Sequence, residues 1–119
     1  MKIAVSAAGP SLDSMVDTRF GRATLFLILD KDADTPDVCG NDQNLNAAQG
    51  AGIQAAQILA SQGVNAVITG HCGPKAFKTL TAAGIRVYTG ASGTVREMLD
   101  KFRKDELTAA VSADVEGHW

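Results

Sequence analysis

The stretch Ile-Thr-Gly-His-Cys-Gly-Pro-Lys, which ends at Lys75, carries the residue types best suited to holding an anion. Gly70 and Gly73 allow the backbone to approach a ligand closely. Pro74 suits the first position of a helix, whose N-terminal end attracts negative charge, and Lys75 adds a formal positive charge. The pattern predicts an anion-binding turn. The alternative is a tight strand-to-helix turn whose glycines serve only its geometry.

A second glycine-rich stretch, Thr89–Thr94, repeats this arrangement further along the chain. Its candidate ligand-binding residues are Gly90, Ser92, Gly93 and Thr94. Thr94 and Glu97 also fit a capping box, which would use some of the free amides at a helix start. A purely structural turn is therefore the alternative here. If the strands before the two stretches are neighbours, both stretches face one ligand.

Arg19, Phe20, Gly21 and Arg22 precede an apolar run and form the third candidate. Two guanidinium groups separated by Phe-Gly could close over a bulky anion, with Phe20 excluding water. The alternative is an ion pair from Asp17 to one of the two arginines, which would only stiffen a loop.

His71 and Cys72 are adjacent soft ligands at an expected helix start, where the pKa of a thiol falls. Neighbouring side chains on an extended loop point apart, and no orienting carboxylate lies nearby in the sequence. A nucleophilic Cys–His pair is therefore not expected, whereas a direct or outer-sphere contact with a metal stays open for both residues. The other cysteine, Cys39, is expected to pack in or beside a hairpin.

Composition excludes several classes of protein. The chain has 119 residues, a net charge of −2 and 5% aromatic residues, so it offers neither a basic footprint for nucleic acid nor a platform for base stacking. No apolar run approaches the ~20 residues that span a bilayer, and the start resembles a strand more than a secretory signal, so a cytoplasmic protein is expected. Two isolated cysteines cannot complete a thiolate zinc or iron–sulfur site.

The elements that position these residues follow from hydrophobic periodicity and turn signals. Strands are expected at 2–6, 24–30, 37–39, 64–69 and 85–88, and helices at 46–62, 74–83 and 95–102. Strands that alternate with helices run parallel and carry helices on both faces, whereas the 24–39 hairpin contributes an antiparallel strand. The expected fold class is therefore α/β, a three-layer α/β/α arrangement with a mixed five-stranded sheet. It forms one domain at 1–107, followed by a loosely held tail at 108–119.

Gly50-x-Gly52-x-x-Ala55 imitates a dinucleotide fingerprint, but it follows a weak hairpin strand and a glycine stands where the later acidic residue is needed. These small residues are expected to serve close packing of a helix.

Several motifs, taken in order, resemble the dinitrogenase iron–molybdenum cofactor family over residues 1–107. They are Asp17-x-Arg19-Phe20-Gly21-Arg22 with Phe26 and Asp30, Gly50-x-Gly52-x-x-Ala55-Ala56, Val67-Ile68-Thr69-Gly70-x-x-Gly73-Pro74-x-Ala76, and Ala83-Gly84-Ile85-x-Val87-Tyr88. The resemblance implies a ribonuclease-H-like fold that binds a preformed metal–sulfur cofactor. For a short stand-alone chain it implies a molybdenum–copper sulfide cluster held without covalent bonds, with the iron–molybdenum cofactor or a precursor as the alternative.

A cluster of this kind is a large, soft polyanion that brings its own sulfide ligands, so two scattered cysteines suffice. The chain must supply positive charge, backbone donors and an apolar wall, because a desolvated anion without partners is costly. Arg19, Arg22, Lys75 and the helix starts at 74 and 95 are expected to supply charge and donors, and Phe20 and Pro74 the wall.

The expected function is thus a carrier or storage protein for such a cluster, and not an enzyme, with protein partners that receive the cluster. The alternative is a regulatory or scaffolding module that binds a phosphorylated or nucleotide ligand in the same crevice. Its docking surface for partner proteins would be the acidic hairpin, with Asp30, Asp32, Asp34, Asp37 and Asp42.

Overall fold

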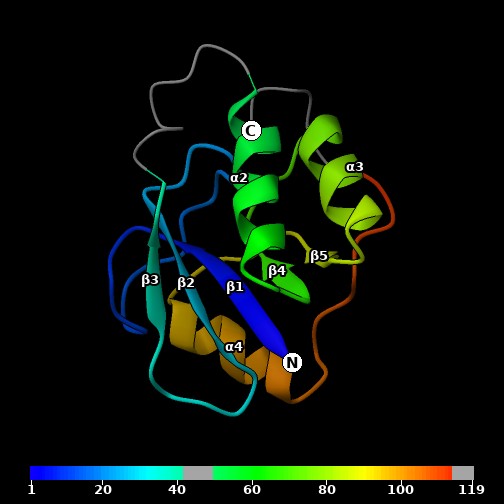
Figure 1. Cartoon of the computed structure of the whole chain (residues 1–119). Helices are drawn as coiled ribbons and strands as arrows, with labels where there is room; N and C mark the ends of the chain where they lie inside the picture. Colours follow the sequence, from blue (N-terminus) through cyan, green and yellow to red (C-terminus); the bar gives the residue numbers. More distant parts are fainter. Residues whose placement is uncertain (42–49, 114–119) are drawn as a thin grey trace.

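A mixed sheet lies at the centre of the computed structural model, which describes residues 1–41 and 50–113 (Figure 1). Its strands are β1 (Lys2–Ala7), β2 (Leu25–Asp30), β3 (Asp37–Gly40), β4 (Ala66–Ile68) and β5 (Arg86–Tyr88). They are arranged in the order β3-β2-β1-β4-β5. β1, β4 and β5 are parallel, whereas β2 is antiparallel to both of its neighbours. This confirms the predicted mixed five-stranded sheet and its hairpin, whose second strand contains the half-buried Cys39.

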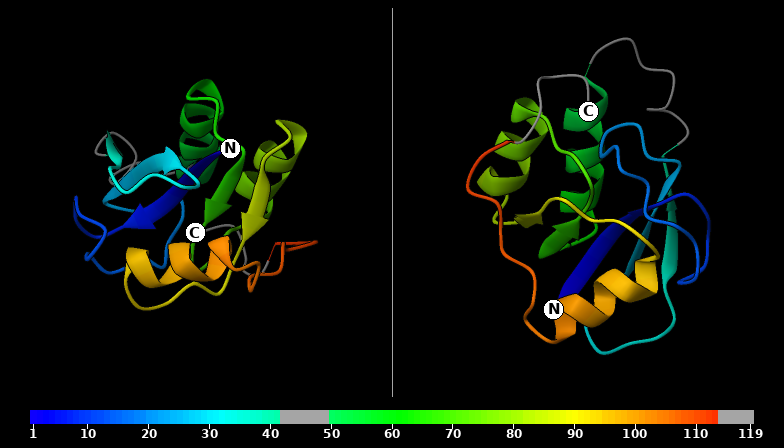
Figure 2. Two further views of the ribbon diagram at one scale, coloured as in Figure 1. Left: turned by 90° about the horizontal axis from the view of Figure 1, so that it is seen from below. Right: turned by 180° about the vertical axis from the view of Figure 1, so that it is seen from behind.

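Helices cover both faces of the sheet, as predicted. In the described residues they are α2 (Ala51–Ser61), α3 (Pro74–Ala82) and α4 (Val95–Arg103). α2 and α3 pack side by side on one face, and α4 lies alone on the other (Figure 2). The first helix was predicted to start at Asn46, which lies outside the described residues, and α2 is capped by Gly50 in a left-handed conformation (φ 76°). Within residues 1–41 and 50–113, no helix has the length and apolar character needed to cross a bilayer.

Two apolar layers hold the helices against the sheet. The predicted helical spacing of apolar residues in α4 is confirmed, because its buried residues are Val95, Met98, Leu99 and Phe102. On the other face, Leu59 of α2 and Leu80 of α3 are completely buried. β1 and β2 are covered on both sides, which explains why their apolar runs are nearly continuous.

The segment after α4 runs along the outer edge of β5. The Ala110 amide donates to the carbonyl oxygen of Val87 at 2.7 Å, and Ala109 packs against the core. The expected loosely held tail is thus fixed at these residues, because β5 leaves its edge open for a backbone partner. Residues 114–119 of the expected tail lie outside the described part.

Candidate functional site

The carboxyl ends of the parallel strands carry the segments that sequence analysis singled out, and backbone pairing ties two of them together. Arg19 and His71 form a parallel bridge. The Phe20 amide donates to the His71 carbonyl oxygen at 3.2 Å, and the His71 amide donates to that of Thr18 at 2.7 Å. The arginine segment, residues 17–22, therefore lies directly beside the turn of residues 70–75.

Two glycines make these contacts close. A Cβ atom on Gly70 would lie 2.7 Å from the backbone of Thr18, and one on Gly21 would lie 2.6 Å from the amide nitrogen of Gly52. Both distances are shorter than a side chain tolerates. Gly70 and Gly21 thus have a packing role in holding the arginine segment against the turn and against the start of α2.

A buried polar network fixes the arginine segment to the sheet. The Ser6 hydroxyl, at the end of β1, donates to the Asp17 carbonyl oxygen at 2.6 Å and lies 2.8 Å from the Thr69 hydroxyl. Further along, the buried Asn41 side chain donates to the carbonyl oxygens of Gly21 and Ala23, at 3.1 and 2.8 Å. The positioning role of Asn41 is not predictable from the sequence, because an isolated Asn carries no pattern.

Asp17 organises the same segment with its side chain. Its carboxylate, 8% exposed, accepts hydrogen bonds from the amides of Arg19 and Thr24, both at 3.1 Å. It also forms an ion pair of 3.5 Å with the Arg19 guanidinium, which remains 47% exposed. The predicted loop-stiffening ion pair is thus present, yet it leaves the half-exposed guanidinium at the surface beside the turn. Arg22 is half-buried.

The N-terminal end of α3 offers backbone donors. Pro74 occupies the first position, and the Phe77 amide donates to the Gly73 carbonyl oxygen at 2.9 Å. Between them, the amides of Lys75 and Ala76 have no acceptor in the described part of the chain. The Pro74 and Lys75 side chains are exposed at the same point. The turn thus combines a cation with amides that no described residue accepts from, as the sequence predicted.

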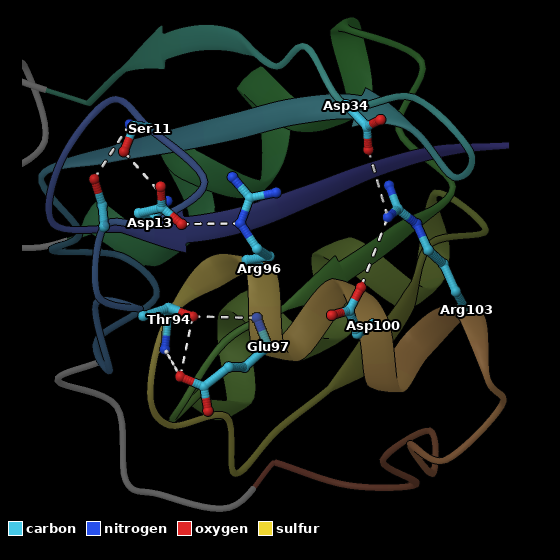
Figure 3. Close-up of polar contacts among 9 residues, drawn as sticks. Ser11, Asp13, Asp34, Thr94, Arg96, Glu97, Asp100 and Arg103 are labelled. Carbon is cyan, nitrogen blue, oxygen red and sulfur yellow. Dashed lines mark hydrogen bonds and ion pairs between the residues drawn. The ribbon is translucent and has the colours of Figure 1, made fainter.

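The prediction that the N-terminal end of α4 donates backbone hydrogen bonds to a ligand is wrong. Val95 and Arg96 donate their amides to the carbonyl oxygens of Ser14 and Leu12, at 2.9 and 2.8 Å. The Thr94 hydroxyl accepts the Glu97 amide in the predicted capping box (Figure 3). The loop after β1 covers this helix start, so these amides are not available to a ligand.

The start of α2, which was not predicted as part of the site, offers backbone donors in place of the start of α4. Among the described residues, its amides at Ala51, Gly52 and Ile53 have no acceptor. Gly52 lies against Gly21 of the arginine segment. α2 and α3 both begin at the upper end of the molecule in Figure 1. The signal was Gly50-x-Gly52: Gly52 gives the predicted close packing, and the N-cap residue Gly50 has no side chain that could accept from the first amides.

The expected apolar wall at Phe20 is also wrong. Phe20 is completely buried and its ring packs 5.4 Å from that of Phe26. An aromatic ring between β2 and the helices gains more from the core than from solvent, so it cannot act as a lid.

Cys72 is likewise completely buried, with its sulfur 3.7 Å from the Gly73 carbonyl oxygen, whereas His71 is half-buried. No cluster of three or more metal-ligating side chains occurs in the ranges described.

The stretch at 89–94 lies beside the turn, because β4 and β5 are neighbours. The Gly90 amide donates to the Gly70 carbonyl oxygen at 2.8 Å, and the Gly93 carbonyl oxygen accepts from Val16 at 2.9 Å. Ser92 is exposed next to them. These bonds show that the stretch has a structural role, and its contact with a ligand stays a prediction.

Residues 1–105 match the dinitrogenase iron-molybdenum cofactor family. The chain belongs to this family. Its fold agrees with solved structures of similar proteins. The apo form of the orange protein from Desulfovibrio gigas is 40% identical with a TM-score of 0.93, and the match covers 96% of each chain. A NifB candidate from Thermotoga is 37% identical with a TM-score of 0.82, over 98% of each chain.

An uncharacterized protein of Methanocaldococcus jannaschii is a further relative of this chain. It is 29% identical over 110 residues, which cover 90% of this chain and 89% of the relative. The predicted family and its α/β/α fold are thus confirmed over nearly the whole chain.

Proposed function

We propose that this protein binds a preformed anionic metal–sulfur cluster, without covalent bonds, and carries or stores it. The family description and the likeness to the orange protein support binding of a metal cluster. We further propose that the cargo is a cluster of the molybdenum–copper sulfide type, that the protein works in the cytoplasm, and that it catalyses no reaction on the cluster.

The observation that carries the proposal is the position of the arginine segment between the starts of α2 and α3, whose first amides have no acceptor among the described residues. Arg19 is paired with the turn that leads into α3, and Gly21 contacts the start of α2. Free amides at a helix start bind anions, because they donate hydrogen bonds and lie at the positive end of the helix dipole. Charge-assisted hydrogen bonds from Arg19 and Lys75 would add to the binding energy.

The donor set suits a cluster that already has its sulfide ligands. Cys72 is completely buried, and the described residues offer no group of three metal-ligating side chains. Such a site would hold a bare metal ion poorly, because bare transition-metal ions need several ligand atoms. Sulfide-rich anions instead accept hydrogen bonds from amides and guanidinium groups, which this site provides.

Reconstitution tests the proposal. The purified chain is incubated with tetrathiomolybdate and a copper salt, passed through a gel-filtration column, and analysed for molybdenum, copper and visible absorption. We expect molybdenum and copper to elute with the protein together with a charge-transfer spectrum. Elution of the protein without either metal would contradict the proposal.

The arginine segment is tested by the double variant Arg19→Gln/Arg22→Gln, which should retain less cluster than the wild type. The control Arg96→Gln/Lys101→Gln removes the same charge from α4 and should retain the wild-type amount. Equal loss in both variants would show that net charge alone governs retention. Cys72→Ala separates ligation from non-covalent binding, since the proposal predicts a nearly unchanged spectrum.

A further inference from the structure

A cavity of about 310 Å³ lies at the opposite end of the molecule from the starts of α2 and α3. In Figure 1 and in the right view of Figure 2, the N-terminus and the end of α4 are both at this end. Its lining residues are Met1, Lys31, Arg86, Tyr88, Phe102, Asp105 and Leu107. They come from the start of β1, the turn after β2, β5, and the end of α4 with the segment that follows. The volume is at the lower end of the range for small-molecule sites.

The Tyr88 hydroxyl has no hydrogen-bond partner in the described part of the chain, although the residue is only 8% exposed. The ring is held firmly, because it packs edge-on against Phe102 with centroids 5.3 Å apart. A buried hydroxyl normally finds a partner, since leaving it unpaired costs free energy. An unsatisfied hydroxyl on a fixed ring that lines a cavity points to a ligand that supplies the partner.

Two cations line the same cavity and form no ion pair within the described residues. The contact found for the Arg86 guanidinium is weak, 3.9 Å from the sulfur of Met1, and the half-buried Lys31 has no ion-pair partner. The amino group of Met1 lies 4.0 Å from the Asp30 carboxylate, so that pair adds no net charge. Asp105 is the acidic residue in the lining. With two cations and one carboxylate, the side chains that line the cavity carry a net charge of about +1.

We propose that this cavity binds a small organic monoanion: a carboxylate attached to a compact apolar body. The carboxylate accepts hydrogen bonds from Arg86, Lys31 and the Tyr88 hydroxyl, because all three are donors without an acidic partner in the described part of the chain. The apolar body packs on the Phe102 ring and Leu107. A single net charge favours a monoanion over the polyanion proposed for the other end, so the two sites select different ligands.

Benzoate, benzyl alcohol and inorganic phosphate test the two parts of this proposal on the full chain. Binding is followed by amide shifts in ¹H–¹⁵N NMR spectra. We expect benzoate to shift amides around Arg86, Tyr88 and Asp105 in a saturable way. Benzyl alcohol, which lacks the charge, and phosphate, which lacks the apolar body, should each bind about tenfold more weakly. Benzoate shifts elsewhere, or benzyl alcohol binding as tightly as benzoate, would overturn the proposal.

Two variants assign the contacts. Arg86→Gln should weaken benzoate binding about tenfold, and Tyr88→Phe by about threefold to tenfold. Both should fold normally, because the Arg86 side chain is exposed and the Tyr88 hydroxyl has no partner among the described residues to lose. Lys78→Gln on α3 removes the same charge as Arg86→Gln and should bind benzoate as the wild type does. An equal effect of Arg86→Gln and Lys78→Gln would overturn the site. The test needs no metal cluster, so its outcome is independent of the proposed cargo.

Discussion

The hydroxyl oxygens of Ser6 and Thr69 lie 2.8 Å apart in a completely buried position, where the end of β1 meets the end of β4. Both strands are followed by segments of the candidate site. The pair also holds the Asp17 carbonyl oxygen, so one hydroxyl contact links three parts of the chain. Disturbing it should therefore affect stability and cargo binding together.

Ser6→Ala should lower the free energy of unfolding by about 1–3 kcal/mol, because it leaves the Asp17 carbonyl and the Thr69 hydroxyl without a partner. Urea unfolding measures the change. The double variant Ser6→Ala/Thr69→Val should lose less than the sum of the single variants, since both remove the same contact. The exposed Ser92→Ala is the control. Strict additivity of the two buried changes would contradict the coupling.

Gly70→Ala should destabilise the fold by roughly 1–3 kcal/mol, because the added Cβ overlaps the backbone of Thr18. Gly40→Ala in β3 is the matched control, since nothing lies within 4 Å of its Cβ position. Chemical denaturation of both variants tests the difference. If Gly40→Ala were as harmful as Gly70→Ala, close packing would not explain the glycine.

Lys75→Ala should weaken cluster retention several-fold, because it removes the cation carried by the first turn of α3. Lys78→Ala, on the same helix and also exposed, removes the same charge and should behave as the wild type. Equilibrium dialysis of tetrathiomolybdate and copper at two salt concentrations is the measurement. The difference between the variants should shrink at high salt, since exposed charges are screened. Equal affinities at low salt would exclude Lys75 from the site.

Asp105→Gly should raise the free energy of unfolding by about 0.5–1 kcal/mol. Asp105 follows α4 with a φ of 59°, and its amide donates to the Phe102 carbonyl oxygen at 3.1 Å. Glycine adopts this left-handed conformation without the strain of a side chain. Glu106→Gly, where the φ is ordinary, should instead be neutral or destabilising. Thermal and urea unfolding decide, and a less stable Asp105→Gly would mean that its carboxylate makes a stabilising contact.

The Arg96 guanidinium, 2.9 Å from Asp13, holds the pKa of that carboxyl below its ordinary value of 3.8 (Figure 3). Because the folded-state pKa is lowered, the pair's contribution to stability is present above the ordinary pKa and lost as the pH falls through the folded-state value. Arg96→Gln should return the Asp13 pKa towards 3.8 in an NMR titration. Its stability should be lower than wild type at pH 7 and equal below both pKa values. An unmoved Asp13 titration would disprove the pairing.

The sequence predicted the layers and strand directions because periodicity and turn residues are local signals. The apolar spacing in α4 and the Thr94 capping box both appeared where expected. Strand ends differed by one or two residues, as for β4, predicted at 64–69 and found at Ala66–Ile68. Such ends depend on pairing across the sheet, which sequence patterns do not show.

The candidate site was predictable only in part. The turn at 70–75 and the arginine segment lie side by side. This proximity depends on the order of the strands in the sheet, which local sequence patterns do not show. Phe20 was assigned to a lid because flanking arginines suggested an exposed loop, whereas its ring fills the core. The α4 start was assigned to the ligand, although carbonyl oxygens of Ser14 and Leu12, over 80 residues earlier in the chain, take its amides. Such long-range hydrogen bonds leave no trace in a local pattern.

The closed start of α4 has a consequence for delivery. Within residues 1–41 and 50–113, the first amides of α2 and α3, on one face of the sheet, have no acceptor, whereas those of α4, on the other face, are occupied. Cargo held as we propose would therefore be accessible from one side of the sheet only, the side covered by α2 and α3. A recipient protein would approach over α2 and α3, and the opposite flank would be free to diverge without disturbing the transfer.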